Sequence, residues 1–146
     1  MNQRPARSPR TCFIDTSAYF APANRRDANH ARARLALERL AAAATRLYTT
    51  NFVLAETHAL LLNRMNRAVA YAFVQRLYEG ATTIVRISRG DEQRAWDIVG
   101  RYQDKDFTLT DATSFAVMDR LRIEQAFTLD ADFARYGFTT LALAHP

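Results

Sequence analysis

Short β-prone runs alternate with longer amphipathic segments along most of the chain. The runs at 11–14, 46–50 and 83–88 are rich in apolar and β-branched residues, and the segments between them repeat apolar residues at helical spacing. Two further short runs follow at 125–130 and 139–143. Strands alternating with helices of ten or more residues indicate a parallel sheet covered by helices on both faces. The pattern therefore predicts an α/β fold.

The predicted helices differ in how much apolar surface they carry. The segment 27–44 has one apolar and one basic stripe, and 67–79 has an apolar stripe and stops at Gly80, a residue typical of the position after a helix. The segment 52–63 is apolar nearly all round, which predicts a buried helix, and Asn51 before it is a suitable N-cap.

The other helical segments are shorter or less regular. Residues 18–24 are expected to form a short irregular or helical turn ended by Pro22, and 91–102 a helix whose Trp96 packs in the core or an interface. The remaining helices are predicted over 111–121 and 132–136.

Length and composition bound the class of protein. At 146 residues the chain fits one domain, which we place at 11–146, after a flexible basic tail at 1–10. No apolar run approaches the roughly 18 residues that span a bilayer, and the tail lacks the apolar region of a secretory signal. The single cysteine, Cys12, cannot form an internal disulfide, so a reducing, cytoplasmic setting is compatible.

The charge balance is basic. The formal net charge is +5 and the sequence pI is near 9.9, which points to a polyanionic partner or to the basic tail. Nearly all of the 20 basic residues are arginines, a preference that suits phosphate binding but also follows from a compositional bias.

Four acids occupy matching positions in the predicted elements. Asp15 and Asp130 end apolar strands, whereas Glu56 and Asp111 lie in the first turns of buried helices. In a right-handed parallel α/β layer, the carboxyl ends of strands and the helix starts that follow them share one edge of the sheet. We therefore expect these four carboxylates to converge there.

Converging carboxylates imply a metal site. Four of them would repel one another unless divalent cations lie between them, and Mg²⁺ or Mn²⁺ prefers such oxygen ligands. Two such ions can generate a hydroxide and stabilise the attacking and leaving oxygens of a phosphodiester. A basic body around an acidic centre also suits a nucleic-acid backbone. The residues thus predict a metal-dependent phosphodiester hydrolase.

Other interpretations of the same acids stay open. Taken singly, Asp111 is explained by helix capping and Asp130 by a turn, and Asp132 is the best auxiliary ligand among the remaining acids. A non-catalytic binding module would hold at most a structural cation, with the helices 27–44 and 52–62 forming a groove for a partner helix.

Several other chemistries lack the residues they need. Phosphomonoester hydrolysis through an aspartyl nucleophile at Asp15 lacks the usual second aspartate, because Ser17 occupies that position. The glycines form no phosphate-binding loop, no GxSxG element is present, and the three histidines have no zinc spacing.

Four motifs together carry a family resemblance. They are FIDTSA around Asp15, LAET at Glu56, TDATSFAVM with Asp111 and TLDADF with Asp130. Each is weak alone, but the ordered set resembles the PIN-domain ribonucleases, and among them the VapC toxins of VapBC toxin–antitoxin systems. The resemblance spans Thr11 to Leu143.

The resemblance implies a three-layer α/β/α sandwich and a Mg²⁺-dependent endoribonuclease, with Mn²⁺ able to substitute, that cleaves a tRNA or rRNA loop. It also implies a cognate VapB-like antitoxin and a homodimer. Asp15 and Asp111 would be the principal metal ligands, Glu56 a ligand or water-orienting base, and Asp130 a second-metal ligand. The hydroxyls of Thr16, Ser17 and Thr110 would hold ligands or water.

Overall fold

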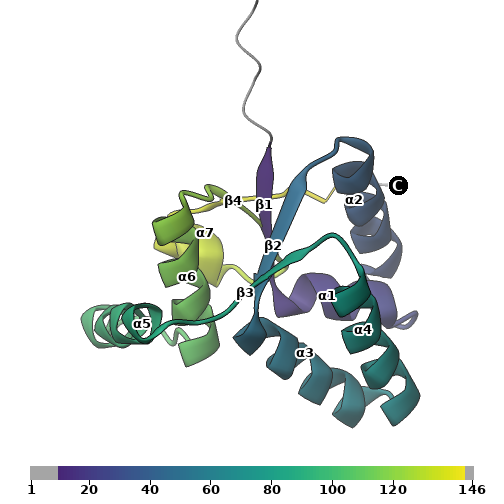
Figure 1. The fold of residues 1–146 in the computed structure, drawn as a ribbon, viewed down its shortest axis with the longest axis horizontal. Helices are drawn as coiled ribbons and strands as arrows, with labels where there is room; N and C mark the ends of the chain where they lie inside the picture. Colours follow the sequence, from purple (N-terminus) through teal and green to yellow (C-terminus); the bar gives the residue numbers. More distant parts are fainter. Residues whose placement is uncertain (1–9, 144–146) are drawn as a thin grey trace, which may run out of the picture.

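The computed structural model describes residues 10–143, and its centre is one five-stranded sheet (Figure 1). All strand pairs are parallel, in the order β3-β2-β1-β4-β5. The strands are β1 (Thr11–Ile14), β2 (Arg46–Thr50), β3 (Thr83–Val85), β4 (Gln125–Phe127) and β5 (Thr139–Thr140). The predicted parallel α/β architecture is confirmed. The predicted tail, apart from Arg10, lies outside the described residues.

Helices cover both faces of this sheet. They are α1 (Thr16–Ala23), α2 (His30–Ala42), α3 (Asn51–Arg64), α4 (Arg67–Glu79), α5 (Arg89–Arg101), α6 (Leu109–Leu121) and α7 (Asp132–Tyr136). In Figure 1, α1, α2 and α4 lie on one side of the sheet, and α5, α6 and α7 lie on the other. Within residues 10–143, no helix is both long and apolar enough to cross a membrane.

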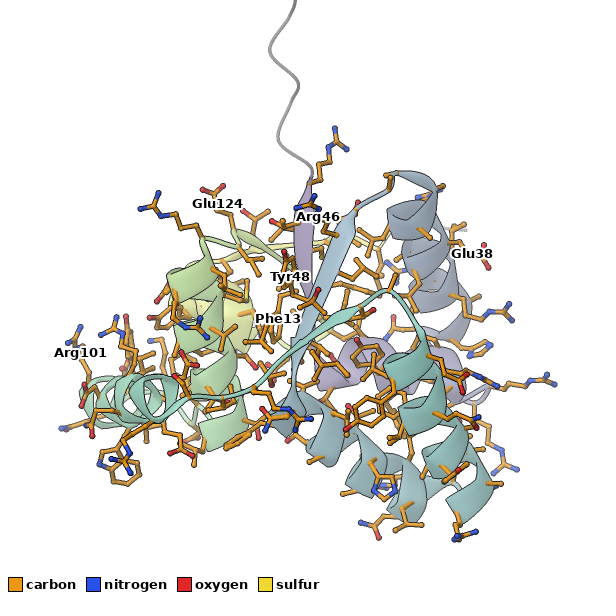
Figure 2. The ribbon with its side chains drawn as sticks, in the orientation of Figure 1. Phe13, Glu38, Arg46, Tyr48, Arg101 and Glu124 are labelled. Atoms are coloured by element: carbon orange, nitrogen blue, oxygen red, sulfur yellow. The ribbon has the colours of Figure 1, made fainter. Side chains whose placement is uncertain are left out.

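The central strand β1 supplies both halves of the core. Cys12 and Ile14 pack against α1 and α2, whereas Phe13 points to the opposite face and packs against α6 and α7. Figure 2 shows Phe13 and Tyr48 together at the centre of the molecule, with the labelled charged residues at its periphery. The sheet is thus packed on both faces, and its carboxyl edge is left for a site.

The last part of β4 differs from the prediction. The strand ends at Phe127, so Asp130 lies in the loop beyond it and does not end the strand. The backbone amide of Asp130 donates to the Thr128 hydroxyl, and the amide of Asp132 donates to the Asp130 carboxylate. These side chains take the place of ladder partners and turn the chain. The predicted strands at 83–88 and 139–143 are also shorter in the structure.

Several helix boundaries differ from the prediction, and three of the differences have a local reason. Helix α1 continues through Pro22 to Ala23, since a proline near the last turn costs only one internal hydrogen bond. Helix α2 begins at His30, because the Asp27 carboxylate accepts the Asn29 amide and holds a turn at the predicted start. Thr50 caps α3 through Val53, whereas Asn51 is its first residue.

The structure also bears on two predictions about burial, and that of a buried helix over 52–63 was wrong. Helix α3 buries only a stripe of Val53, Thr57 and Leu61, so Glu56 on its other side is exposed. Trp96 is 66% exposed, so it does not pack in the core, and its packing in an interface stays a prediction.

An apolar groove lies between α1, α2 and α4. It consists of two adjoining hollows of about 550 and 320 Å³ that share Pro22, Ala23, Val69 and Arg76. Arg25 and Arg34 add further positive charge to one hollow. We call this surface the α1/α2/α4 groove. The groove for a partner helix between the segments 27–44 and 52–62 stays a prediction.

Candidate active site

A cavity of about 500 Å³ opens at the carboxyl edge of the sheet. Its lining includes all four predicted acids, from four separate parts of the chain. Asp15 follows β1, Glu56 lies on α3, Asp111 lies in the first turn of α6, and Asp130 lies in the loop after β4. The structure therefore brings these residues together at the edge where parallel topology places them.

Asp15 is the most buried of the four acids, with 4% of its surface exposed. Its Oδ2 accepts hydrogen bonds from the Thr128 hydroxyl at 2.9 Å and from the Ser17 hydroxyl at 3.3 Å. Burial, together with the smaller effect of the charges of Asp111 and Glu56, raises the pKa of Asp15 to about 6 against the opposing effect of its hydrogen bonds. Its charged form is thus costly in the protein alone.

Asp111 has a structural and an electrostatic role. It forms a capping box with Thr108: the Thr108 hydroxyl accepts the Asp111 amide at 3.0 Å, and Asp111 Oδ2 accepts the Thr108 amide at 3.1 Å. The capping role foreseen for this residue is therefore real. Burial nevertheless raises the pKa of Asp111, and the neighbouring Asp130 and Glu56 carboxylates add to the shift.

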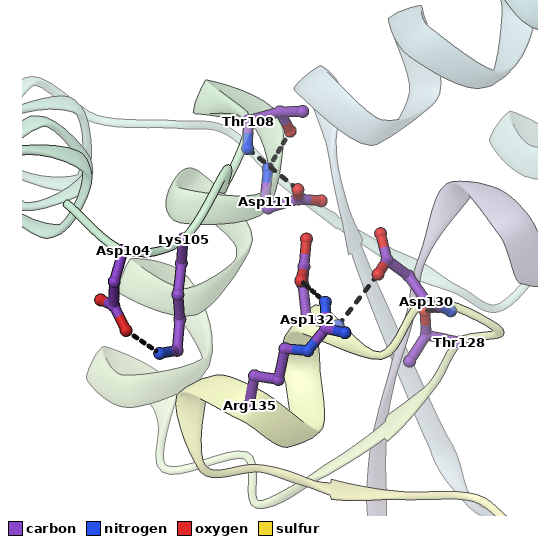
Figure 3. Close-up of polar contacts among 8 residues, drawn as sticks. All are labelled: Asp104, Lys105, Thr108, Asp111, Thr128, Asp130, Asp132 and Arg135. Carbon is purple, nitrogen blue, oxygen red and sulfur yellow. Dashed lines mark hydrogen bonds and ion pairs between the residues drawn. The ribbon is translucent and has the colours of Figure 1, made fainter. Parts of the chain in front are cut away.

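A cluster of three carboxylates stands beside Asp15. Single carboxylate oxygens of Asp111, Asp130 and Asp132 all lie within 4.8 Å of one another, an arrangement able to hold a metal ion. Figure 3 shows these side chains converging from the start of α6, the loop after β4 and the start of α7. Asp132 also pairs with Arg135 at 2.9 Å. Asp132, predicted only as an auxiliary ligand, thus belongs to the cluster of three carboxylates.

Glu56 reaches the cavity from the opposite wall. The Thr16 hydroxyl donates to Glu56 Oε2 at 2.6 Å and joins α1 to α3 across 40 residues of sequence. Because Glu56 is exposed, this hydroxyl fixes the direction of an otherwise mobile side chain. The Thr16 hydroxyl, predicted to hold ligands or water, thus holds the Glu56 carboxylate in place.

The other predicted hydroxyls divide between the cavity and the helix. Ser17 lines the cavity, and its hydroxyl accepts the Leu129 amide at 2.8 Å, which ties α1 to the loop after β4. Thr110 is not among the lining residues, and its carbonyl accepts hydrogen bonds from Thr113 and Ser114 within α6. Thr108 takes the place expected for Thr110.

Sequence reasoning missed several residues of this site. Thr128 donates to Asp15 and accepts the amide of Asp130, so it links two of the acids. Two of the missed residues had a signal in the sequence that could have found them: Thr108 stands three residues before Asp111, as in a capping box, and Thr128 directly follows a strand. No local signal placed Asp27 or Asn29, which line the cavity from the loop between α1 and α2.

The donor set fits a divalent cation such as Mg²⁺. The ligand atoms on offer are oxygens, and among the described residues that line the cavity none is a lysine or arginine. Neighbouring carboxylates add to the raised pKa of Asp15 and to that of Asp111, an effect that a bound cation would reverse. Cys12 offers no competing nucleophile, because burial raises the pKa of its thiol to about 12.

A PIN-domain family model matches residues 12–139. The chain belongs to the PIN-domain family. Two curated relatives of this PIN domain come from Mycobacterium tuberculosis. The 23S rRNA-specific endonuclease VapC20 is 34% identical over 127 residues, covering 86% of this chain and 94% of VapC20. Ribonuclease VapC26 is 29% identical over 118 residues, covering 81% and 85%.

Solved structures agree with this assignment. The crystal structure of VapC20, described as a sarcin–ricin loop cleaving toxin, has a TM-score of 0.80 at 32% identity and covers 92% of this PIN domain and 99% of that chain. A toxin–antitoxin complex from Klebsiella pneumoniae has a TM-score of 0.63 at 19% identity, over 92% and 99% of the two chains. The second likeness shows the shared fold.

Proposed function

We propose that this PIN domain is a metal-dependent endoribonuclease toxin that cleaves a loop of structured RNA. The convergence of Asp15, Glu56, Asp111 and Asp130 in one cavity carries the proposal. This acidic centre lies in a chain of net charge +5, so the remaining surface attracts a polyanion while the cavity selects cations.

The contacts of each acid suggest a separate role for it. Asp111, Asp130 and Asp132 would hold one cation between them, and Asp15, steadied by Thr128 and Ser17, would complete the site. Bound divalent ions would supply the positive charge that activates water and stabilises the leaving oxygen of a phosphodiester. Glu56, held by Thr16, would orient the attacking water or accept a proton from it.

The relatives narrow the substrate class. VapC20 is named as specific for 23S rRNA and described as cleaving the sarcin–ricin loop. The 34% identity extends over 86% of this chain, so we propose a 23S rRNA loop of that kind as the substrate. A loop suits the site, because a nucleotide in an unpaired strand can be turned into a cavity.

We also propose that a cognate antitoxin inhibits the chain. The α1/α2/α4 groove is a candidate docking surface, because its apolar floor is bordered by Arg25, Arg34 and Arg76. An amphipathic helix with acidic side chains beside its apolar stripe would complement that surface. The expected homodimer stays a prediction that light scattering would check.

The experiment that tests the proposed activity uses a sarcin–ricin loop hairpin and the same hairpin with a replaced loop. Wild-type protein with Mg²⁺ should cut only the first, and EDTA or Asp15→Asn should abolish the cut. Cleavage that persists with EDTA and in Asp15→Asn would contradict the mechanism. Titration with Mn²⁺ tests the alternative of a non-catalytic module, since a pure scaffold should show no binding that depends on Asp15 and Asp111.

A further inference from the structure

The cavity extends beyond its acids into a second half with different chemistry. Helix α1 packs beside α3, and the Thr16–Glu56 contact joins them at the acidic end. Four residues further along each helix, Phe20 and Leu60 also line the cavity. Four residues advance about 6 Å along a helix, on the same face. An apolar wall therefore continues from the acids by about the length of one helical turn.

The loop between α1 and α2 closes this second half. Asp27 and Asn29 both line the cavity and are partly exposed. Asp27 Oδ1 accepts the Asn29 amide at 2.7 Å, which fixes the carboxylate and leaves Oδ2 and further lone pairs for another donor. Asn29 stands at the N-cap of α2, yet its side chain accepts no hydrogen bond from the helix. Asp27 is thus fixed at the cavity wall by one backbone contact and keeps acceptor capacity, and the Asn29 side chain makes no capping hydrogen bond to the helix.

We propose that this second half binds the guanine base of a nucleotide next to the scissile phosphate. The inference rests on the proposed ribonuclease function and adds a residue-level basis for its sequence preference. Unpaired bases are recognised by stacking on aromatic side chains and by hydrogen bonds to their edges. Phe20 and Leu60 supply the apolar contact, and Asp27 and Asn29 supply the edge contacts.

The pattern of donors and acceptors favours guanine over uracil and adenine. A carboxylate presents two acceptors side by side, and guanine presents two adjacent N–H donors on one edge, followed by a carbonyl oxygen. The Asp27 carboxylate therefore complements the two donors, and the side-chain NH₂ of Asn29 complements the carbonyl oxygen. Uracil presents a single N–H between two carbonyls, so one of its oxygens would meet the carboxylate. Adenine has no ring N–H on that edge.

The test compares cleavage of hairpins that carry guanine, inosine, adenine or uracil at each nucleotide flanking the mapped cut. Wild-type protein should prefer guanine at one position, and inosine, which lacks the amino group, should be cut about tenfold more slowly. Asp27→Asn should reduce the preference for guanine about tenfold to hundredfold, the range for one bidentate base contact. The side-chain oxygen of the new asparagine can still accept the backbone N–H of Asn29, so the loop should keep its fold. Asp97→Asn, an exposed change on α5, is the matched control.

Any one of three cleavage results would overturn the inference. They are equal cleavage of all four RNAs by wild type, an unchanged preference in Asp27→Asn, or a loss in Asp27→Asn that is the same for every base. Weaker capture of the antitoxin by Asp27→Asn with an unchanged base preference would assign this half of the cavity to the antitoxin, and would also overturn it.

A nucleotide titration tests the base site independently of the proposed ribonuclease activity. If wild-type protein cuts no RNA, the proposed function fails, and titration with GMP, AMP and UMP then decides the base site by itself. GMP should shift the NMR signal of the Asn29 side-chain amide at lower concentration than UMP, and Asp27→Asn should remove that difference. Equal responses to GMP and UMP would refute the base site.

Discussion

Helices α5 and α6 begin in the same way and end up in opposite electrostatic surroundings. Each starts with a capping box whose third residue is a buried aspartate, Asp91 after Ser88 and Asp111 after Thr108. Asp91 accepts two hydrogen bonds from Arg120, at 2.8 and 2.9 Å, and this partner lowers its pKa. Asp111 faces Asp130 and Asp132, and its pKa is raised. One local motif thus serves the scaffold in α5 and the site in α6.

The largest expected difference between the two aspartates is in cleavage. Asp111→Asn should lower the rate of RNA cleavage at least about hundredfold, because a neutral amide replaces a carboxylate that holds the cation. The amide oxygen can still accept the Thr108 amide, so the fold should remain. Initial rates, with circular dichroism as the check on folding, measure the effect. Asp91→Asn should keep a near wild-type rate, and an equal loss in both variants would remove the distinction.

The second difference is in the pH dependence of stability without metal. The folded-state pKa of Asp15, about 6, lies above the ordinary value of 3.8, so the folded chain keeps a proton that the unfolded chain has lost. Stability should therefore fall as the pH rises from about 4 to about 7, by about 2 to 3 kcal/mol from this group. The lowered pKa of Asp91 acts in the opposite sense: its contribution is present above the ordinary value and is lost as the pH falls below it.

Urea unfolding in EDTA at several pH values, for wild type and Asp15→Asn, measures the contribution of Asp15. The free energy of unfolding of wild type should drop relative to that of Asp15→Asn as the pH rises, because other titrating groups cancel in the difference. Parallel curves for the two proteins would show that Asp15 ionises in the fold without cost.

A smaller effect is expected when the scaffold aspartate loses its charge. Asp91→Asn removes the paired contact with Arg120 that joins α5 to α6, and should lower the free energy of unfolding by about 1 to 2 kcal/mol, since Arg120 is half exposed and recovers solvent. Thermal unfolding in EDTA would show the loss. Asp111→Asn in the same buffer should be no less stable than wild type, since it relieves repulsion. Destabilisation of Asp111→Asn alone would reverse the assignment.

The smallest effect separates the two caps. Ser88→Ala and Thr108→Ala should each cost about 1 kcal/mol of stability, because each removes the acceptor for a first-turn amide. Only Thr108→Ala should also weaken Mn²⁺ binding, by a few fold, because Thr108 holds Asp111 in place at the cavity. Calorimetric titration of the two variants compares them directly. Weaker Mn²⁺ binding in Ser88→Ala would show that the effect is general destabilisation.

Much of the fold follows from local sequence. The bounds of β2 and α4 agree with the sequence pattern, and each has a helix-capping residue at one end: Thr50 is the last residue of β2, and Asn66 precedes α4. The end of β4 does not, because the Thr128 and Asp130 side chains compete with the strand ladder for backbone amides. Such competition depends on which loop conformation the rest of the fold permits.

By itself, the sequence determined the order of strands and helices and the placement of Asp15, Glu56, Asp111 and Asp130 at one sheet edge. It could do so because parallel topology gathers strand ends without any knowledge of side-chain contacts. Only the tertiary structure decided that Asp132 joins the cluster, that Glu56 is exposed, and that Asp111 and not Asp91 belongs to the site. The reason is physical: capping is satisfied within one turn of helix, whereas the charge state of a buried carboxylate depends on neighbours that folding brings from distant parts of the chain.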